Sequence, residues 1–289
     1  MGKREPMALD LAPFAEEIDF LHSLDARVGR LEMPRDRPRP VLLPSYRGTR
    51  TQPNLTALVA LLLQRYGVPA LVHGPKAATA GSQPASRRVG KVASAPVFAT
   101  FTADVLWELG IEPARSRADA LERLLHNGIA YAPIDVLAPG FAPRVAAREE
   151  ALGRPLLPTL AALLDPFGGD GFHVIGATDE EELAAFRAWV ITTRGNALLF
   201  CGTEGEPFAD PHRQPRLEHL TAGAATVCVE EEAAAAGAAK EPLLPSTPDA
   251  PTTAAWITQA MAGSVPLPPP IVTQLGCCLN GARRLGAAA

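Results

Sequence analysis

Acidic residues are absent from a long stretch of this chain. The 289 residues include 31 Asp and Glu, yet none of these lies between Asp36 and Asp104. The cations of this stretch are Arg37, Arg39, Arg47, Arg50, Arg65, Lys76, Arg87, Arg88 and Lys91. Cations without neighbouring carboxylates favour polyphosphates or nucleic acid as partners. Alternatively, a dimer partner or the acidic half of the same chain covers the stretch and cancels its charge.

The charge is divided unevenly between the two halves of the chain. Residues 1–148 hold 19 Lys and Arg against 14 acids, and residues 149–289 hold 8 against 17. The halves therefore carry +5 and −9, which together give the net charge of −4. The sequence pI of about 5.9 hides this asymmetry.

Long hydrophobic runs and cysteine patterns are also missing. The longest apolar run, Ala57 to Leu63, is much shorter than the ~18 residues that a membrane-spanning helix needs. The first residues lack the apolar stretch of a signal peptide, so we expect a cytoplasmic protein that does not enter a membrane. Four cysteines without a CxxC pair predict reduced thiols. Six histidines without paired spacing argue against a zinc site.

Helical and extended patterns alternate along the chain. An amphipathic helix is expected over residues 14–24, followed by a basic, proline-rich linker. Strands are expected at 41–43, 68–72, 129–132, 172–176, 197–200 and 226–230. Helices are expected at 54–66, 102–109, 116–126, 180–192, 252–261 and 271–282. A strand, turn, helix and strand in this order predict a right-handed crossover and hence an α/β fold with a parallel sheet.

Two segments interrupt this alternation. Residues 75–96 are small, polar and basic without periodicity, which predicts a mobile loop. Residues 230–245 include the low-complexity run EEEAAAAGAAK, which predicts a second flexible insertion. We expect residues 1–38 to be the remnant of a small helical domain with its linker, and residues 39–289 to form the α/β domain.

The segment PSYRG lies between an expected strand and an expected helix. Turn amides and a helix N-terminus both offer unpaired donors to a phosphate, and Arg47 and Arg50 would add charge-assisted hydrogen bonds. The alternative is an ordinary loop with exposed arginines.

The longer segment PSYRGTRTQPNLTALVALLLQRYGVPALVHG resembles the phosphate-binding stretch of the anthranilate phosphoribosyltransferase superfamily. Asn54 and Thr56 match the start of the family's helix, and His73 and Gly74 match the end of its next strand. The resemblance implies a mostly parallel central sheet flanked by helices, and a small N-terminal helical domain through which a homodimer forms. Family members carry several helices before the position of Phe14, so we expect that domain to be truncated here.

The resemblance also shows departures at the residues that carry the chemistry. The family's phosphate loop is glycine-rich and contains an aspartate, and here it is replaced by Ser45, Tyr46, Arg47 and Gly48. Pro207 and Phe208 stand where the enzymes keep two carboxylates for magnesium, a cation that needs oxygen ligands. Glu204 and Glu206 lie nearby but out of register, and we interpret them as ordinary loop carboxylates.

Two further arginines match family positions near the active-site face. Arg148 and Arg154 correspond to arginines of which the enzymes use one to place the acceptor carboxylate. Pro158, Ala161 and Ala162 replace the polar and glycine–proline residues that accompany them. Alternatively, Arg148 pairs with Glu149 or Glu150 on a helix surface.

These departures are typical of the YbiB-type proteins, a sister group within the superfamily. The narrower resemblance is carried by PSYRGTRTQPNLT, by GTEGE at 202–206 and by the Cys277–Cys278 pair. It implies a DNA-binding or, more generally, a nucleic-acid-binding protein without the biosynthetic activity.

We therefore expect sequence-independent binding to the backbone of single- or double-stranded nucleic acid, without a metal or cofactor. Tyr46 could add base stacking. The candidate contacts are Ser45, Tyr46, Arg47, Gly48, Arg50, Asn54, Thr56, His73, Gly74, Lys76, Arg87, Arg88, Lys91, Arg148 and Arg154. One alternative is a magnesium-dependent phosphoribosyltransferase acting on phosphoribosyl pyrophosphate and an aromatic or heterocyclic acceptor. Another is a regulatory protein that keeps a vestigial nucleotide site.

Overall fold

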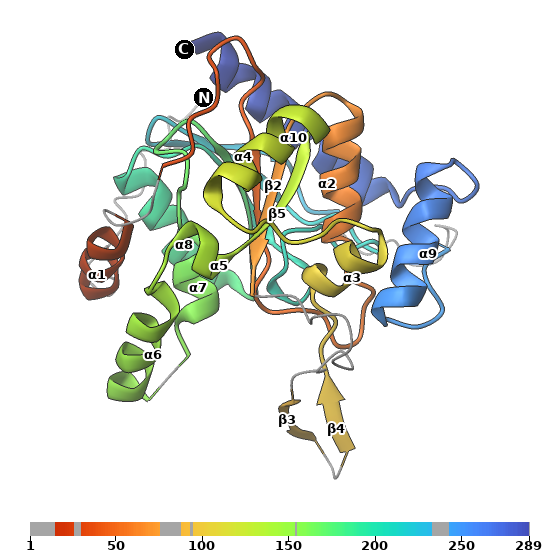
Figure 1. Cartoon of the computed structure of the whole chain (residues 1–289), viewed down its shortest axis with the longest axis horizontal. Helices are drawn as coiled ribbons and strands as arrows, with labels where there is room; N and C mark the ends of the chain where they lie inside the picture. The colour runs from red at the N-terminus through yellow and green to blue at the C-terminus, as the bar shows by residue number, and fades with distance from the viewer. Residues whose placement is uncertain are drawn as a thin grey trace, which may run out of the picture.

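A computed structural model of the protein describes residues 15–25, 30–75, 88–92, 95–153, 155–232 and 243–288. Its centre is a seven-stranded sheet in the order β5-β2-β1-β6-β7-β8-β9 (Figure 1). The strands are β1 (Val41–Pro44), β2 (Ala70–Gly74), β5 (Ile129–Pro133), β6 (Phe172–Ala177), β7 (Ala197–Cys201), β8 (Leu217–Thr221) and β9 (Ala224–Val229). The first five pair in parallel, and β8 and β9 extend the sheet in antiparallel fashion.

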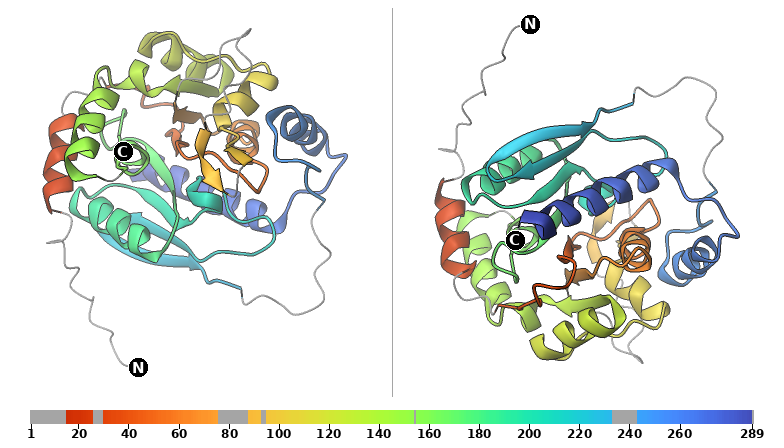
Figure 2. Two further views of the ribbon diagram at one scale, coloured as in Figure 1. Left: turned by 90° about the horizontal axis from the view of Figure 1, so that it is seen from below. Right: turned by 90° about the horizontal axis from the view of Figure 1, so that it is seen from above.

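Helices cover both faces of the sheet (Figure 2). Those packed with β1 and β2 on one face are α2 (Thr56–Arg65), α3 (Thr102–Glu108), α9 (Ala250–Met261) and α10 (Pro269–Ala288). The other face carries α1 (Ala15–Asp25), α4 (Arg117–Asn127), α5 (Ile134–Leu137), α6 (Phe141–Leu152), α7 (Leu157–Ala162) and α8 (Glu180–Thr192). The arrangement is therefore a three-layer α/β/α fold.

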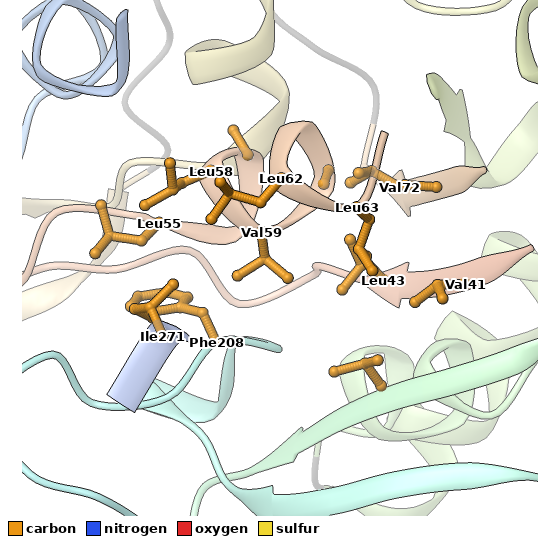
Figure 3. Packing of buried hydrophobic residues seen from close by; sticks show 14 of the residues in the cluster. Val41, Leu43, Leu55, Leu58, Val59, Leu62, Leu63, Val72, Phe208 and Ile271 are labelled. Carbon is orange, nitrogen blue, oxygen red and sulfur yellow. The ribbon is translucent and has the colours of Figure 1, made fainter. Parts of the chain in front are cut away.

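Alternation along the strands explains why both faces are covered. Val41 and Leu43 of β1 point into the core beneath α2, whereas Leu42 between them belongs to the cluster beneath α4. Since all three are fully buried, β1 is apolar throughout, as expected of a central parallel strand. Figure 3 shows Leu43 below α2, with Phe208 and Ile271 closing the same cluster.

The structure confirms the predicted fold class and most of the predicted elements. The strands at 41–43, 129–132, 172–176 and 197–200 lie within one or two residues of their expected bounds. Ser116 begins α4 as predicted, because its hydroxyl accepts a hydrogen bond from the Asp119 amide at 3.1 Å. Within the described ranges, every helix is too short or too polar to cross a lipid bilayer.

Three regions of the chain differ from the sequence prediction. Part of the expected loop 75–96 forms a hairpin of β3 (Arg88–Val92) and β4 (Ala95–Phe98), which pair with each other apart from the main sheet. β8 was missed because Glu218 interrupts its apolar pattern, although its carboxylate is buried in an ion pair with Arg187. Helices α5 to α7 were not predicted, because prolines interrupt the helical spacing of apolar residues in this part of the sequence.

Candidate anion site at the carboxyl edge of the sheet

The predicted phosphate turn lies where the parallel strands end. β1 leads into residues 45–55 and then into α2, while β7 leads into a short 3-10 turn, η2 (Thr203–Gly205). Both segments are at the carboxyl edge of the sheet, the usual ligand-binding edge of open α/β folds. The two segments meet there, and their contacts decide what the turn can bind.

The backbone of the turn is fixed by a neighbouring segment. Thr49 and Thr100 form an isolated antiparallel bridge, with amide-to-carbonyl distances of 3.0 and 2.8 Å. Gly48 has a φ of 65° and lies against this bridge, where an added Cβ would come within 3.1 Å of the Thr100 carbonyl. Glycine is therefore favoured at this position, because another residue would be strained at this φ and its Cβ would be tightly packed.

A buried carboxylate occupies the first half of the turn. One oxygen of Glu206 accepts hydrogen bonds from the amides of Arg47 and Gly48, both at 2.7 Å. Its other oxygen accepts a hydrogen bond from the Ser45 hydroxyl. Burial raises the pKa of Glu206 above its usual value, and the bonds from Ser45, Gly48 and Arg47 oppose that rise. These amides are the donors that a bound phosphate would need.

A second carboxylate occupies the rest of the turn. Glu204 accepts hydrogen bonds from the amides of Arg50 and Thr51 at 2.9 Å, from the Thr51 hydroxyl at 2.9 Å and from the Gln52 amide at 3.3 Å. Burial acts to raise its pKa, but the hydrogen bonds from Thr51 and Arg50 outweigh it and hold the pKa below the usual value. Glu204 adopts a left-handed φ of 51°, a strained conformation for a non-glycine residue. The turn amides thus bind two carboxylates of the chain itself, and phosphate binding at the turn stays a prediction.

The two arginines of the turn are paired as well. Arg47 forms an ion pair with Glu182, in the first turn of α8, and also donates to the Thr159 hydroxyl at 3.3 Å. Arg50 lies 3.6 Å from the Glu204 carboxylate and keeps 34% of its side chain exposed. At these two positions the acidic half of the chain does cover the basic stretch.

Three polar residues of the predicted site are fully buried. The Asn54 carboxamide accepts from the Thr56 amide at 3.2 Å and donates to the Thr100 carbonyl at 3.2 Å. The Nδ1 atom of His73 lies 2.8 Å from the Tyr46 hydroxyl. Burial lowers the pKa of His73 to about 3, so its imidazole is neutral. Asn54, Thr56 and His73 expose no surface to a partner and instead connect β1, β2 and the start of α2.

Gly74 ends β2 directly beneath the turn. A Cβ at this position would lie 2.3 Å from the Ser45 carbonyl oxygen, so a side chain would push β2 and the turn apart. The His73–Gly74 pair is therefore explained by packing between the two strand ends.

Pro207 and Phe208, at the positions where the related enzymes keep carboxylates for magnesium, are apolar. Phe208 is fully buried and packs with α2 and α10 (Figure 3). The Gln274 carboxamide of α10 accepts from the Ala209 amide at 2.8 Å and donates to the Pro207 carbonyl at 2.9 Å. Glu204 and Glu206 already bind backbone amides, so this donor set does not fit a magnesium ion. No cluster of three or more metal-ligating side chains occurs in the part of the chain that the structure describes.

Comparison with known proteins shows which family this chain belongs to. No protein-family profile matches the chain. A protein of Escherichia coli K12 described as the uncharacterized protein YbiB is 30% identical over 266 residues, which cover 92% of this chain and 76% of that protein. The chain belongs to the YbiB family.

Solved structures show which fold this chain shares. Anthranilate phosphoribosyltransferase of Thermus thermophilus superposes with a TM-score of 0.64 at 17% identity, covering 94% of this chain and 77% of that one. The Saccharomyces cerevisiae enzyme, in complex with PRPP and Mg, gives a TM-score of 0.59 at 13% identity and covers 94% and 70%. At these identities the likeness establishes the phosphoribosyltransferase-like fold and nothing about activity.

The remaining candidate residues of this YbiB family member do not join the turn as one described surface. Arg148 of α6 places its guanidinium 5.8 Å from the Phe20 ring centre. The Glu149 carboxylate on the same helix accepts hydrogen bonds from the Leu156 and Leu157 amides. Arg88 and Lys91 lie on β3. Lys76, Arg87 and Arg154 are outside the described residues.

Sequence reasoning did not find which side chains bind the turn. Glu182 and Thr159 gave no signal because they lie more than 100 residues from Arg47 and only the fold brings them together. Glu204 and Glu206 were noticed but interpreted as ordinary loop carboxylates. Their role as acceptors for the turn amides could have been identified from the GTEGE motif. It follows a strand at the same edge of the sheet as the turn, whose amides need acceptors.

Proposed function

We propose that this YbiB family member binds the backbone of nucleic acid without regard to sequence and does not transfer phosphoribosyl groups. The second part of the proposal, the absence of transfer, rests on one observation: the turn amides that a diphosphate would need are taken by Glu204 and Glu206. A phosphoribosyltransferase needs such donors and a magnesium site to stabilise charge on the departing pyrophosphate. Here the donors are occupied, and Pro207 and Phe208 stand in place of the metal's carboxylates.

The cations that remain for a partner lie outside the turn. The β3–β4 hairpin extends away from the sheet in Figure 1 and belongs to the stretch without acidic residues. Its strand β3 contributes Arg88 and Lys91. Cations on a projecting hairpin would contact phosphates through charge, without recognition of base edges. This supports sequence-independent binding.

A titration of labelled single-stranded and duplex DNA at several salt concentrations tests the proposal. If the protein neutralises roughly five phosphates, log K on duplex falls by about four to five units per decade of salt. Binding that is absent, or that does not change with salt, would overturn the proposal. The protein should meanwhile release no pyrophosphate from phosphoribosyl pyrophosphate with magnesium and a panel of aromatic acceptors.

The phosphoribosyltransferase alternative rests on the fold alone. Magnesium-dependent pyrophosphate release in that assay, abolished by substitution of Ser45 in the turn, would establish it. A control with an exposed threonine at the opposite edge of the sheet, Thr221→Ala at the end of β8, would separate this result from a general loss of folded protein.

A further inference from the structure

A cavity of about 310 Å³ lies at the amino edge of the sheet, where β6 and β7 begin. The turn after β1 is at the opposite, carboxyl edge, so the two places are separate. The walls of the cavity come from the loop before β6, from the end of α8 and from His22 of α1, which lies beside α8 (Figure 2). Small-molecule sites in proteins typically have volumes of roughly 300–1,000 Å³, so a small ligand fits here.

The buried part of this cavity is apolar. Four apolar side chains line it and each exposes less than a tenth of its surface: Leu163, Ile175, Trp189 and Val190. The exposed His22 ring lies 4.7 Å from the Trp189 ring, tilted by 43°, and extends this wall toward the solvent. Aromatic side chains pack favourably against other flat rings. The wall therefore suits a ligand with a flat apolar body.

The mouth of the cavity carries two arginines, Arg30 and Arg194. Arg30 precedes β1, and its Nη1 atom donates a hydrogen bond to the Asp165 carbonyl at 2.6 Å. Its guanidinium packs over Gly168, where an added Cβ would lie 3.3 Å from the Arg30 Nε atom. The absence of a side chain at Gly168 thus leaves room for the guanidinium. These contacts hold one positive charge at the wall of the cavity.

The second arginine has an unusual backbone conformation. Arg194 follows α8 with a left-handed φ of 54°, at a place where helices commonly have glycine. Its amide donates to the Ile191 carbonyl at 3.1 Å, and the Gly195 amide donates to the Val190 carbonyl at 2.9 Å, which closes the helix. Glycine would adopt this conformation without strain. Strained residues concentrate at functional sites, which directs attention to the Arg194 side chain.

The carboxylate among the described lining residues is bound by its own loop. Asp165 accepts hydrogen bonds from the Phe167 amide at 2.9 Å and from the Gly169 amide, and His173 Nε2 lies 3.7 Å from its Oδ1 atom. Burial acts to raise the pKa of Asp165, but His173 and the two amides outweigh it and hold the pKa below the usual value. One carboxylate that is bonded internally therefore stands against two arginines, and the described mouth is positively charged.

We propose that this cavity binds a small organic anion with a flat apolar body, whose carboxylate or phosphate group pairs with Arg194 and Arg30. The planar guanidinium of arginine matches both groups through paired N–H donors. The body of the ligand would contact the apolar wall around Trp189, which is too far inside the cavity to be reached by water-soluble anions without such a body. The site is independent of nucleic-acid binding, because it lies at the other edge of the sheet from the turn and uses none of the cations of the β3–β4 hairpin.

Four probes that differ in charge or body test this proposal by isothermal titration calorimetry on the full chain. Benzoate and phenyl phosphate combine a ring with an anionic group, benzyl alcohol has the ring without the charge, and inorganic phosphate has the charge without the ring. At least one aromatic anion should bind about tenfold or more tightly than both benzyl alcohol and inorganic phosphate. The tighter of the two aromatic anions identifies carboxylate or phosphate as the preferred group. Failure of both to bind, or an equal affinity for benzyl alcohol, would overturn the proposal.

Arg194→Gly separates binding from folding. The substitution removes the guanidinium and relieves the left-handed strain, so the variant should unfold at the same or a higher temperature than the wild type. Its affinity for the aromatic anion should nevertheless fall about tenfold or more, because a charge-assisted hydrogen bond is lost. The charge-matched control is Arg117→Ala at the exposed start of α4, outside the cavity, which should bind as the wild type does. Unchanged affinity in Arg194→Gly, or an equal loss in Arg117→Ala, would contradict the assignment.

Discussion

The turn after β1 and the β3–β4 hairpin belong to the same acid-free stretch of sequence, yet they differ in their structural surroundings. Within the turn, Arg47 is paired with Glu182 and Arg50 with Glu204. The backbone amides of the turn donate hydrogen bonds to Glu204 and Glu206. The hairpin pairs only its own two strands and stands apart from the main sheet. A basic stretch of sequence is therefore not one basic surface, because carboxylates from the second half of the chain fold over part of it.

This difference separates the turn's structural role from the hairpin's proposed binding role. The turn is closed by charge pairs within the chain, and removing one partner leaves donors or charges unsatisfied. The hairpin carries two cations on β3 and has no acidic residue in its own sequence. Substitutions in the two regions should consequently act on different measurements, stability in the first case and nucleic-acid affinity in the second.

The largest effect is expected for Glu206→Ala. It leaves two amides and the Ser45 hydroxyl without their acceptor in a fully buried site, at a cost of about 3 kcal/mol in unfolding free energy. Urea denaturation measures the loss. Glu206→Gln keeps one oxygen acceptor and should recover part of it, whereas Glu232→Ala on the exposed surface should cost less than about 0.5 kcal/mol. Equal stabilities of Glu206→Ala and Glu232→Ala would contradict the proposed role.

Glu204→Gln should give the next largest effect, a loss of about 1–2 kcal/mol at neutral pH. Because the folded-state pKa of Glu204 is depressed, its stabilisation is present above the usual glutamate value of 4.5 and is lost as the pH falls through the lower folded value. The wild type and the variant should therefore converge in stability at acidic pH. Denaturation curves at several pH values test this, and a difference that grows on acidification would refute it.

Removing the same carboxylate should also expose a site for anions. In Glu204→Ala the amides of Arg50, Thr51 and Gln52 lose their acceptor and become free to bind pyrophosphate. A thermal shift with pyrophosphate should be larger in this variant than in the wild type. If the variant gains no affinity for pyrophosphate, the carboxylate is not standing in for a phosphate group.

The comparison between turn and hairpin is sharpest in the salt dependence of DNA binding. Arg88→Ala with Lys91→Ala should reduce the slope of log K against log salt by about two, since two phosphate contacts are removed. Arg47→Ala with Arg50→Ala removes the same charge from already paired positions and should change the slope much less. Arg115→Ala with Arg117→Ala on the α4 side serves as the charge-matched control. A larger effect in the turn than in the hairpin would reverse the assignment.

The sequence predicted the fold well because its signals there are local. The apolar runs of β1 and α2, the capping pair Ser116–Asp119 and Gly74 at the end of β2 each fix a short segment and together specify a parallel α/β arrangement. The sequence also indicated that the amides and arginines of the turn can bind anionic groups, and phosphate binding there stays a prediction. The carboxylates that occupy the turn could not be predicted, because the contacts of Glu182, Glu204 and Glu206 depend on long-range topology. A buried carboxylate and an exposed loop carboxylate look the same in sequence.

Tyr46→Phe is expected to have the smallest effect and tests whether Tyr46 belongs to the binding surface at all. The Tyr46 side chain is buried and its hydroxyl bonds to His73 Nδ1, so removing the hydroxyl should cost about 1 kcal/mol in stability. Because the ring is inaccessible, affinity for single-stranded DNA should stay unchanged, contrary to the stacking role that the sequence suggests. A stability measurement and a binding titration on the same preparation distinguish the two cases. Weakened single-strand binding without loss of stability would mean that the turn opens and Tyr46 stacks on a base.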